Sequence, residues 1–330
     1  MIGSAHRPFA VWLGGSAALF VTAAIVLPFI GPSRIDLAGV WHGQEPDWSI
    51  LTRLRVSRTL LGLCAGGALA LAGSLFQSML RDALATPYTL GVSTGASLGA
   101  VLAIAAGLHT TMGVTGVWAG ALAGAALVLL LVMGAARKDR QVSVSGLLLA
   151  GIAINSVCGA LILLVHGLTG VSQSFAISRW LIGSLDAIEF PTLTAYMALV
   201  AAVSVITIRR ARQWNLLAVG EAWAATRGAP VTQSLVAGYV AGSLLAATTV
   251  ALAGPIGFVG LVVPHLLRAR VGGDDRLVMP CAFLVGGVLL ASCDALGRVL
   301  LAPAEVPAGA ITAFIGAPHL IWVVRKGTTR

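Results

Sequence analysis

The residue types that perform catalysis are scattered in this sequence rather than grouped. A reactive centre needs a nucleophile beside a base, paired carboxylates or clustered metal ligands, and no apolar segment contains such a group. His166, His265 and His319 stand far apart, and the four cysteines lack the close paired spacing of metal sites. We therefore expect packed free thiols, no catalytic residue, and no metal or cofactor site in this chain.

One acidic and one basic side chain stand inside an otherwise apolar segment. Asp294 lies four residues before Arg298, so the two would share one face of a helix. An ionisable residue near the centre of a bilayer is typical of ion-coupled transport. Because Arg298 can neutralise Asp294, the pair favours a structural role, and an ion-coupled secondary transporter stays as the alternative from another class.

The elements that must position these residues are long apolar helices. The chain has 330 residues, of which 58% are apolar and 10% charged. A helix needs about 20 apolar residues to cross a bilayer, and the sequence predicts an all-α, polytopic membrane protein with about ten such spans in a single domain, residues 1–330. The expected spans are 9–30, 59–80, 90–108, 112–134, 144–168, 192–208, 232–252, 256–267, 278–300 and 306–324.

The basic residues set the orientation of these spans. With the N-terminus in the cytoplasm and 256–267 counted as a span, most of the 21 lysines and arginines fall inside, which agrees with the positive-inside rule. Those that fall outside are Arg34, Arg53, Arg55, Arg58, Arg179 and Arg298. Both termini are then cytoplasmic. The net charge of +9 belongs almost entirely to loops beside the membrane, so no nucleic-acid partner is expected.

The longest polar-flanked stretch on the predicted inner side is NLLAVGEAWAATRGAP, residues Asn215–Pro230. Its composition is helical, but it is too polar to span the bilayer. Leu217 and Trp223 offer apolar anchors, whereas Glu221 and Arg227 stay polar. A short helix here could lie on the membrane surface or dock into the groove of a partner.

Within this stretch, EAWAATRG resembles the Glu-Ala-Ala, three residues, Gly pattern by which bacterial ABC importer permeases contact their ATPase subunits, with Trp223 replacing the second alanine. The resemblance implies a helix-turn-helix that seats in a cleft of the ATPase, with Gly228 permitting the turn. The alternative is an ordinary surface helix joining two spans. We call residues 215–230 the coupling segment. The resemblance assigns ATPase contact to Leu217, Gly220, Glu221, Ala222, Ala225, Arg227 and Gly228.

Three long segments extend this resemblance over nearly the whole chain. They are GPIGFVGLVVPHLLRARVGGDDR (254–276), LLAPAEVPAGAITAFIGAPHLIW (300–322) and LATPYTLGVSTGASLGA (84–100). Together they resemble the iron-siderophore, haem and cobalamin permease family, which implies the type II ABC importer permease fold. Ser57 and Ala83 replace two turn prolines of the family, so the local backbone can differ at those two places.

The same resemblance implies a partner on the outer face, a periplasmic or lipid-anchored binding protein whose acidic residues meet arginines of the permease. Arg55, Arg58 and Arg298 match those positions. A guanidinium is always charged, and its planar fork suits carboxylates. The alternatives are contact with lipid phosphate or, for Arg298, the pair with Asp294.

In this family two permease copies, here expected to be a homodimer, enclose the cargo route at their interface. The resemblance assigns the gates to the fifth span and to the segment that follows it, residues 175–185. Asn155 and Ser156 are polar groups within the fifth span, so they either line the route or bond between helices. Trp180 and Gly183 complete the expected path residues.

The resemblance as a whole implies the permease of an ATP-driven importer in the bacterial cytoplasmic membrane, and not an enzyme. The chain has no Gly-rich loop ending in Gly-Lys-Ser or Gly-Lys-Thr, so two copies of a separate ATPase must hold ATP and Mg. The PYTLGVSTGASLGA region most resembles siderophore permeases, which makes an iron siderophore the first choice of cargo. Haem and cobalamin remain alternatives.

Overall fold

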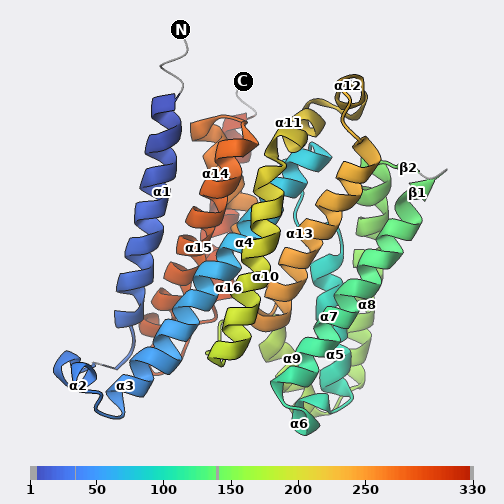
Figure 1. Cartoon of the computed structure of the whole chain (residues 1–330). Helices are drawn as coiled ribbons and strands as arrows, with labels where there is room; N and C mark the ends of the chain where they lie inside the picture. Colours follow the sequence, from blue (N-terminus) through green and yellow to red (C-terminus); the bar gives the residue numbers. More distant parts are fainter. Residues whose placement is uncertain (1–5, 34, 139–140, 328–330) are drawn as a thin grey trace.

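The computed structural model describes residues 6–33, 35–138 and 141–327. Within these residues the regular secondary structure is helical except for one hairpin, in which β1 (Arg137–Lys138) pairs antiparallel with β2 (Gln141–Val142), and an isolated bridge between Leu301 and Ala304. The helices run roughly side by side and form one bundle (Figure 1). The all-helical fold predicted from the sequence is therefore confirmed.

Seven helices of the described part are long and apolar enough to cross a membrane. They are α1 (His6–Val26), α4 (Ser57–Leu80), α7 (Val114–Ala136), α8 (Val144–Leu168), α10 (Phe190–Arg209), α13 (Val231–Ala253) and α15 (Asp275–Leu300). Three further helices complete the bundle: α5 (Val92–Ala105), α14 (Val259–Val271) and α16 (Ala308–Gly327). Each lies within a few residues of its predicted span, because long uninterrupted apolar runs fix helix positions in a bilayer.

Short elements cap the two ends of the bundle. One end carries η1 (Leu27–Phe29), α2 (Leu37–Trp41), α3 (Asp47–Ser49), η2 (Ile50–Val56), α6 (Leu108–Thr111) and α9 (Val171–Leu181). The opposite end carries α11 (Ala211–Val219), α12 (Glu221–Thr226), the hairpin and the first turn of α1 (Figure 1). The segment predicted at 175–185 begins earlier, at Val171, because the chain turns into α9 soon after α8 ends.

Helix α4 lies at the centre of the packing and α8 at its margin. In the most apolar stretch of each helix, 94% of the residues are buried for α4 and 17% for α8. Glycines allow α4 to approach its neighbours closely: a Cβ added to Gly66 would lie 2.2 Å from the carbonyl oxygen of Gly286, and one on Gly73 would lie 1.8 Å from that of Gly260. Backbone contact of this kind is how helices pack where no hydrophobic force drives them together.

The two positions that lack the family prolines adopt different structures. Ser57 continues the helix from η2 into α4, and its hydroxyl donates a hydrogen bond to the carbonyl oxygen of Ile188 at 2.6 Å. Ala83 lies in the turn after α4, which Arg81 begins with a left-handed φ of 55°. A proline at 57 would carry no hydroxyl, so this tie to the loop before α10 depends on the serine.

Candidate functional site

The coupling segment folds as two short helices that stand out from one end of the bundle (Figure 1). The first, α11, begins at Ala211, before the segment itself, and the second is α12. The break between them falls at Gly220, whereas the resemblance places the turn at Gly228. Gly228, with φ of 76°, instead ends α12 and returns the chain toward α13. A left-handed φ of this kind favours glycine.

One side of this pair of helices is anchored and the other is open. Trp214 and Leu217 are each only 1% exposed, and the indole nitrogen of Trp214 donates to the carbonyl oxygen of Thr207 at 2.9 Å. Arg227 is exposed and stacks over the ring of Trp223 at 4.9 Å. The other exposed residues predicted to contact the ATPase are Ala222, Ala225 and Gly228.

Glu221 forms an ion pair that links α12 to the end of α4. Its carboxylate lies 3.4 Å from a guanidinium nitrogen of Arg81, and both side chains are partly exposed. Ion pairs in such surroundings contribute little to stability. The Glu221–Arg81 pair therefore shows where the coupling segment contacts α4, but it contributes little to holding them together.

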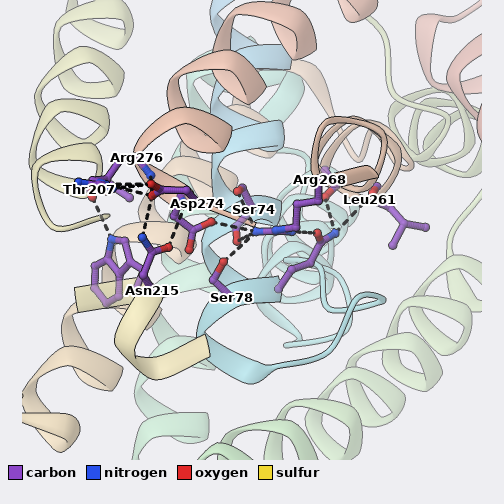
Figure 2. Close-up of polar contacts among 12 residues, drawn as sticks. Ser74, Ser78, Thr207, Asn215, Leu261, Arg268, Asp274 and Arg276 are labelled. Atoms are coloured by element: carbon purple, nitrogen blue, oxygen red, sulfur yellow. Dashed lines mark hydrogen bonds and ion pairs between the residues drawn. The ribbon is translucent and has the colours of Figure 1, made fainter. Parts of the chain in front are cut away.

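A buried polar cluster lies behind the coupling segment, which we call the inner cluster: Ser74, Gln77, Ser78, Arg268 and Asp275. The Arg268 guanidinium donates to the carbonyl and hydroxyl oxygens of Ser74 at 2.9 and 3.1 Å, and to the hydroxyl of Ser78 at 2.8 Å. It also contacts the Gln77 side chain and pairs with Asp275 at 3.2 Å. Asp275 is fully buried. The cluster thus joins α4, α14 and the start of α15 (Figure 2).

Asn215 connects α11 to the start of α15. Its amide nitrogen donates to the Asp274 carboxylate at 2.8 Å, and its amide oxygen accepts from the backbone N–H of Asp275 at 2.9 Å. Hydrogen bonds from Arg276 chiefly, and from Asn215 to a smaller degree, lower the pKa of Asp274 to about 2 against the opposing effect of burial. Asp274 is therefore ionised at any physiological pH.

At the opposite end, the three arginines predicted to dock a binding protein lie around one cavity of about 360 Å³. Glu305 also lines this cavity. We call Arg55, Arg58, Asp294, Arg298 and Glu305 the outer cluster. Arg55 is buried and donates to the carbonyl oxygen of Ser33 at 2.6 Å, which leaves its guanidinium committed to the loop after η1.

Asp294 is the shared partner of the other two arginines. Its carboxylate lies 2.9 Å from Arg58, which also pairs with Glu305 at 2.8 Å. The Nε of Arg298 lies 3.6 Å from Asp294, and neither Nε nor Nη2 has a hydrogen-bond partner among the described residues. The Asp294–Arg298 pair expected from the sequence is therefore present, but Arg58, 236 residues away along the chain, is the closer partner.

A family model described as the FecCD transport family matches residues 18–326. The hemin transport system permease protein HmuU of Yersinia pestis is 34% identical over 318 residues, which cover 95% of each chain. The chain belongs to the FecCD transport family. It is accordingly a multi-pass permease of an ABC transporter and is not itself catalytic.

Other proteins similar to this FecCD permease support the same family assignment. The vitamin B12 import system permease protein BtuC of Klebsiella pneumoniae is 34% identical over 328 residues, covering 97% of this chain and 95% of that protein. A solved structure of an ABC transporter assigned to the metal-chelate type, in an inward-facing conformation, has a TM-score of 0.83 and 29% identity, covering 95% of this chain and 98% of that one. The fold expected from the resemblance is thus confirmed.

The four residues predicted to line the cargo route lie in different surroundings. Asn155 accepts a hydrogen bond from the Thr94 hydroxyl, which ties α8 to α5, while Ser156 is exposed and donates to the carbonyl oxygen of Ile152 at 3.0 Å. Trp180 lines a second cavity of about 500 Å³ near α9. Gly183 is buried, and a Cβ there would lie 2.3 Å from the carbonyl oxygen of Pro255.

Among the described residues, no group of three His, Cys, Asp or Glu is placed to hold a metal ion. The four cysteines, Cys64, Cys158, Cys281 and Cys293, are buried free thiols, as the sequence predicted.

Sequence reasoning missed Asn215 and the inner cluster of this FecCD permease. Arg268, Asp274 and Asp275 all lie in the stretch 254–276. That stretch indicated the family, but its sequence assigned no role to these residues. Arg268 and Ser74 are 194 residues apart, so no local spacing rule brings them together.

Proposed function

We propose that this permease is the membrane subunit of an ATP-driven importer that carries an iron siderophore across the bacterial cytoplasmic membrane. The observation that supports this most directly is the coupling segment: α12 presents an open face beyond the bundle, while α11 is anchored by buried Trp214 and Leu217. An apolar anchor with an open face suits docking into a partner's groove. Both the start of α1 and the end of α16 lie at this end, which is then the cytoplasmic one (Figure 1).

The partner at the inner end is an ABC ATPase, present in two copies that bind ATP and Mg. Closure of the ATPase pair would move α12 and with it the spans, so that access to the route alternates between the two sides. The exposed surface of Ala222, Ala225, Arg227 and Gly228 is the contact, with Glu221 at its edge beside Arg81. Small residues in this surface would let the backbone of α12 approach the partner closely.

The partner at the outer end is a periplasmic or lipid-anchored binding protein that delivers the cargo. Three arginines and Glu305 line the cavity of the outer cluster, whose volume of about 360 Å³ leaves room for an acidic side chain. Arg58 keeps 14% of its side chain exposed, and its bond to half-exposed Glu305 is the one that an incoming carboxylate would replace. Complementary charge at such a site speeds encounter and selects the partner.

A second copy of the chain would cover the exposed apolar side of α8 and α9 and complete the route as a homodimer. Leu149, Leu163, Val171 and Phe175 on these helices are between 70% and 90% exposed. Lipid also covers apolar helices, so the support comes from a polar side chain nearby. Exposed Ser156 belongs to α8 and would face the route rather than acyl chains, whereas Asn155 bonds Thr94 of α5.

Haem and cobalamin are the alternative cargoes, because a hemin permease and vitamin B12 permeases are each about a third identical to this chain. An ion-coupled secondary transporter is less well supported. Its one candidate carboxylate within a span, Asp294, is 2% exposed and already paired with Arg58 and Arg298. A carboxylate already bound by two arginines has little room left for a coupling ion.

Reconstitution in liposomes tests the proposal. The permease, the ATPase and the binding protein are combined, and uptake of a ferric hydroxamate siderophore, haem and cobalamin is measured with and without ATP. We expect ATP-dependent uptake of the siderophore, and loss of ATPase co-purification in Glu221→Lys but not in Glu189→Lys, an exposed acidic residue at the outer end. Uptake driven by a proton gradient without ATP would overturn the proposal.

A further inference from the structure

We propose that Asn215 is a positioning residue that transmits movement of the coupling segment to the inner cluster, and so ties ATP hydrolysis to opening of the spans. The proposal rests on the proposed function, since it assumes that an ATPase moves α12. It assigns a role to a residue on the buried side of the segment, away from the contact surface itself. Figure 2 shows Asn215 beside Asp274, with Arg268, Ser74 and Ser78 next in line.

The position of Asn215 on α11 is fixed by its neighbours. Trp214 precedes it and is held by the hydrogen bond to Thr207 at the end of α10. A Cβ on Gly238 of α13 would lie 3.2 Å from the Trp214 ring, so the indole also packs against that helix. The Asn215 side chain therefore leaves α11 in a defined direction, toward the start of α15.

The Asn215 amide binds the start of α15 at two points. It donates to the Asp274 side chain, which also caps α15 by accepting from the backbone N–H of Arg276 at 3.0 Å. It accepts from the backbone N–H of Asp275, one of the N–H groups that no carbonyl within α15 can satisfy. A donor and an acceptor on one planar group fix both the distance and the angle between α11 and α15.

From Asp275 the connection continues through buried groups. Asp275 is fully buried, and its carboxylate pairs with Arg268, which in turn bonds Ser74 and Ser78 of α4. Hydrogen bonds in a low-dielectric interior are strong and polarise one another. Energetic coupling between distant sites is carried by such contiguous networks joined to rigid elements.

The other links from the coupling segment are less suited to transmit force. The Glu221–Arg81 pair is 3.4 Å long and open to solvent, so water can replace either partner. The apolar contacts of Trp214 and Leu217 resist separation but have no preferred direction, so α11 could slide over them. Among the described contacts, the Asn215 amide joins α11 to both aspartates at the start of α15 with defined geometry.

The test compares three variants in the reconstituted complex, with the ferric hydroxamate, haem or cobalamin that the wild-type complex carries. Asn215→Ala removes both bonds, and Asn215→Asp keeps the size of the side chain but sets a carboxylate against Asp274. Gln213→Ala is the matched control, because Gln213 lies on the same helix and its side chain makes no hydrogen bond within the described residues. ATPase co-purification, ATP hydrolysis and cargo uptake are measured for each.

We expect both Asn215 variants to retain ATPase binding and hydrolysis while the cargo carried per ATP falls by about five-fold or more, with Gln213→Ala unchanged. A merely structural role would lower assembly and hydrolysis together and leave this ratio intact. An unchanged ratio in the Asn215 variants overturns the proposal, and so does loss of ATPase binding in them alone, which would make Asn215 part of the contact. Failure of the wild-type chain to bind any ATPase would overturn the proposed function instead.

Discussion

The outer and inner clusters stand at opposite ends of the same pair of helices, α4 and α15, and they use arginine in different ways. In the outer cluster Arg58 and Arg298 pair with the two carboxylates while Arg55 bonds Ser33, and Arg298 keeps two nitrogens without hydrogen-bond partners among the described residues. In the inner cluster one guanidinium has one carboxylate and several neutral oxygens around it. The outer cluster has one positive charge in excess, whereas the inner cluster is balanced.

This difference in charge suits the two clusters to different roles. A cluster with surplus cationic donors beside a cavity can accept a further carboxylate, which suits a surface that meets partners repeatedly. A cluster in which one carboxylate balances one guanidinium has no surplus charge for a partner and instead fixes the helices that it joins. The contrast supports the two proposals: recognition of a binding protein at the outer end and transmission of movement at the inner end.

The largest effect is expected from Asp294→Ala, which removes the carboxylate shared by two arginines of the outer cluster. The change leaves buried Arg298 unpaired and Arg58 with Glu305 alone, so it should lower the free energy of unfolding by about 3–5 kcal/mol, measured by denaturant titration of the detergent-solubilised permease. Glu305→Ala is the control: Glu305 is 48% exposed, and its loss should cost less than about 1 kcal/mol. Similar costs for the two variants would mean that Asp294 does not hold the outer cluster together.

A smaller effect is expected from Asp275→Ala in the inner cluster. Arg268 keeps its hydrogen bonds to Ser74, Ser78 and Gln77. The free energy of unfolding should therefore fall by about 1–3 kcal/mol in the same titration. Arg270→Ala, exposed on the same helix as Arg268, should have no measurable effect. If Asp275→Ala costs as much as Asp294→Ala, the neutral oxygens contribute little and the contrast between the clusters fails.

The smallest effect is expected for the pH dependence of stability that Asp274 causes. The pKa of Asp274 is lowered to about 2, so the stability that it contributes is fully present above its unfolded value of about 3.9 and is lost as pH falls toward 2. The difference in Tm between wild type and Asp274→Asn should therefore stay constant from pH 8 to about 5 and shrink below about 4. A difference that changes between pH 6 and 8 would assign the effect to another group.

The sequence predicted the helices and the coupling segment because both depend on local patterns. Apolar run length determines each span, and EAWAATRG is a contiguous string. It also predicted three arginines that prove to share one cavity, although their burial was not foreseen, because partners such as Ser33 and Asp294 come from separate parts of the chain.

Composition could not tell α4 from α8. Both are apolar throughout, yet one is packed in protein and the other lies at the margin of the bundle, because lipid and protein interior select the same side chains. The inner cluster was missed for a related reason. Serines and a glutamine within an apolar run look like ordinary helix-packing residues until the fold brings Arg268 beside them.

The burial of α4 has a consequence for how this permease would respond to its membrane. The helix that meets the coupling segment at Arg81 and the outer cluster at Arg58 is shielded from lipid along its apolar stretch, and at Gly66 its backbone nearly touches that of α15. A thicker or thinner bilayer would first affect α1, α7, α8 and α10, which are largely exposed. Changes in acyl-chain length should therefore disturb these outer helices, and the pairing of copies proposed at α8 and α9, before they disturb the buried contacts of α4.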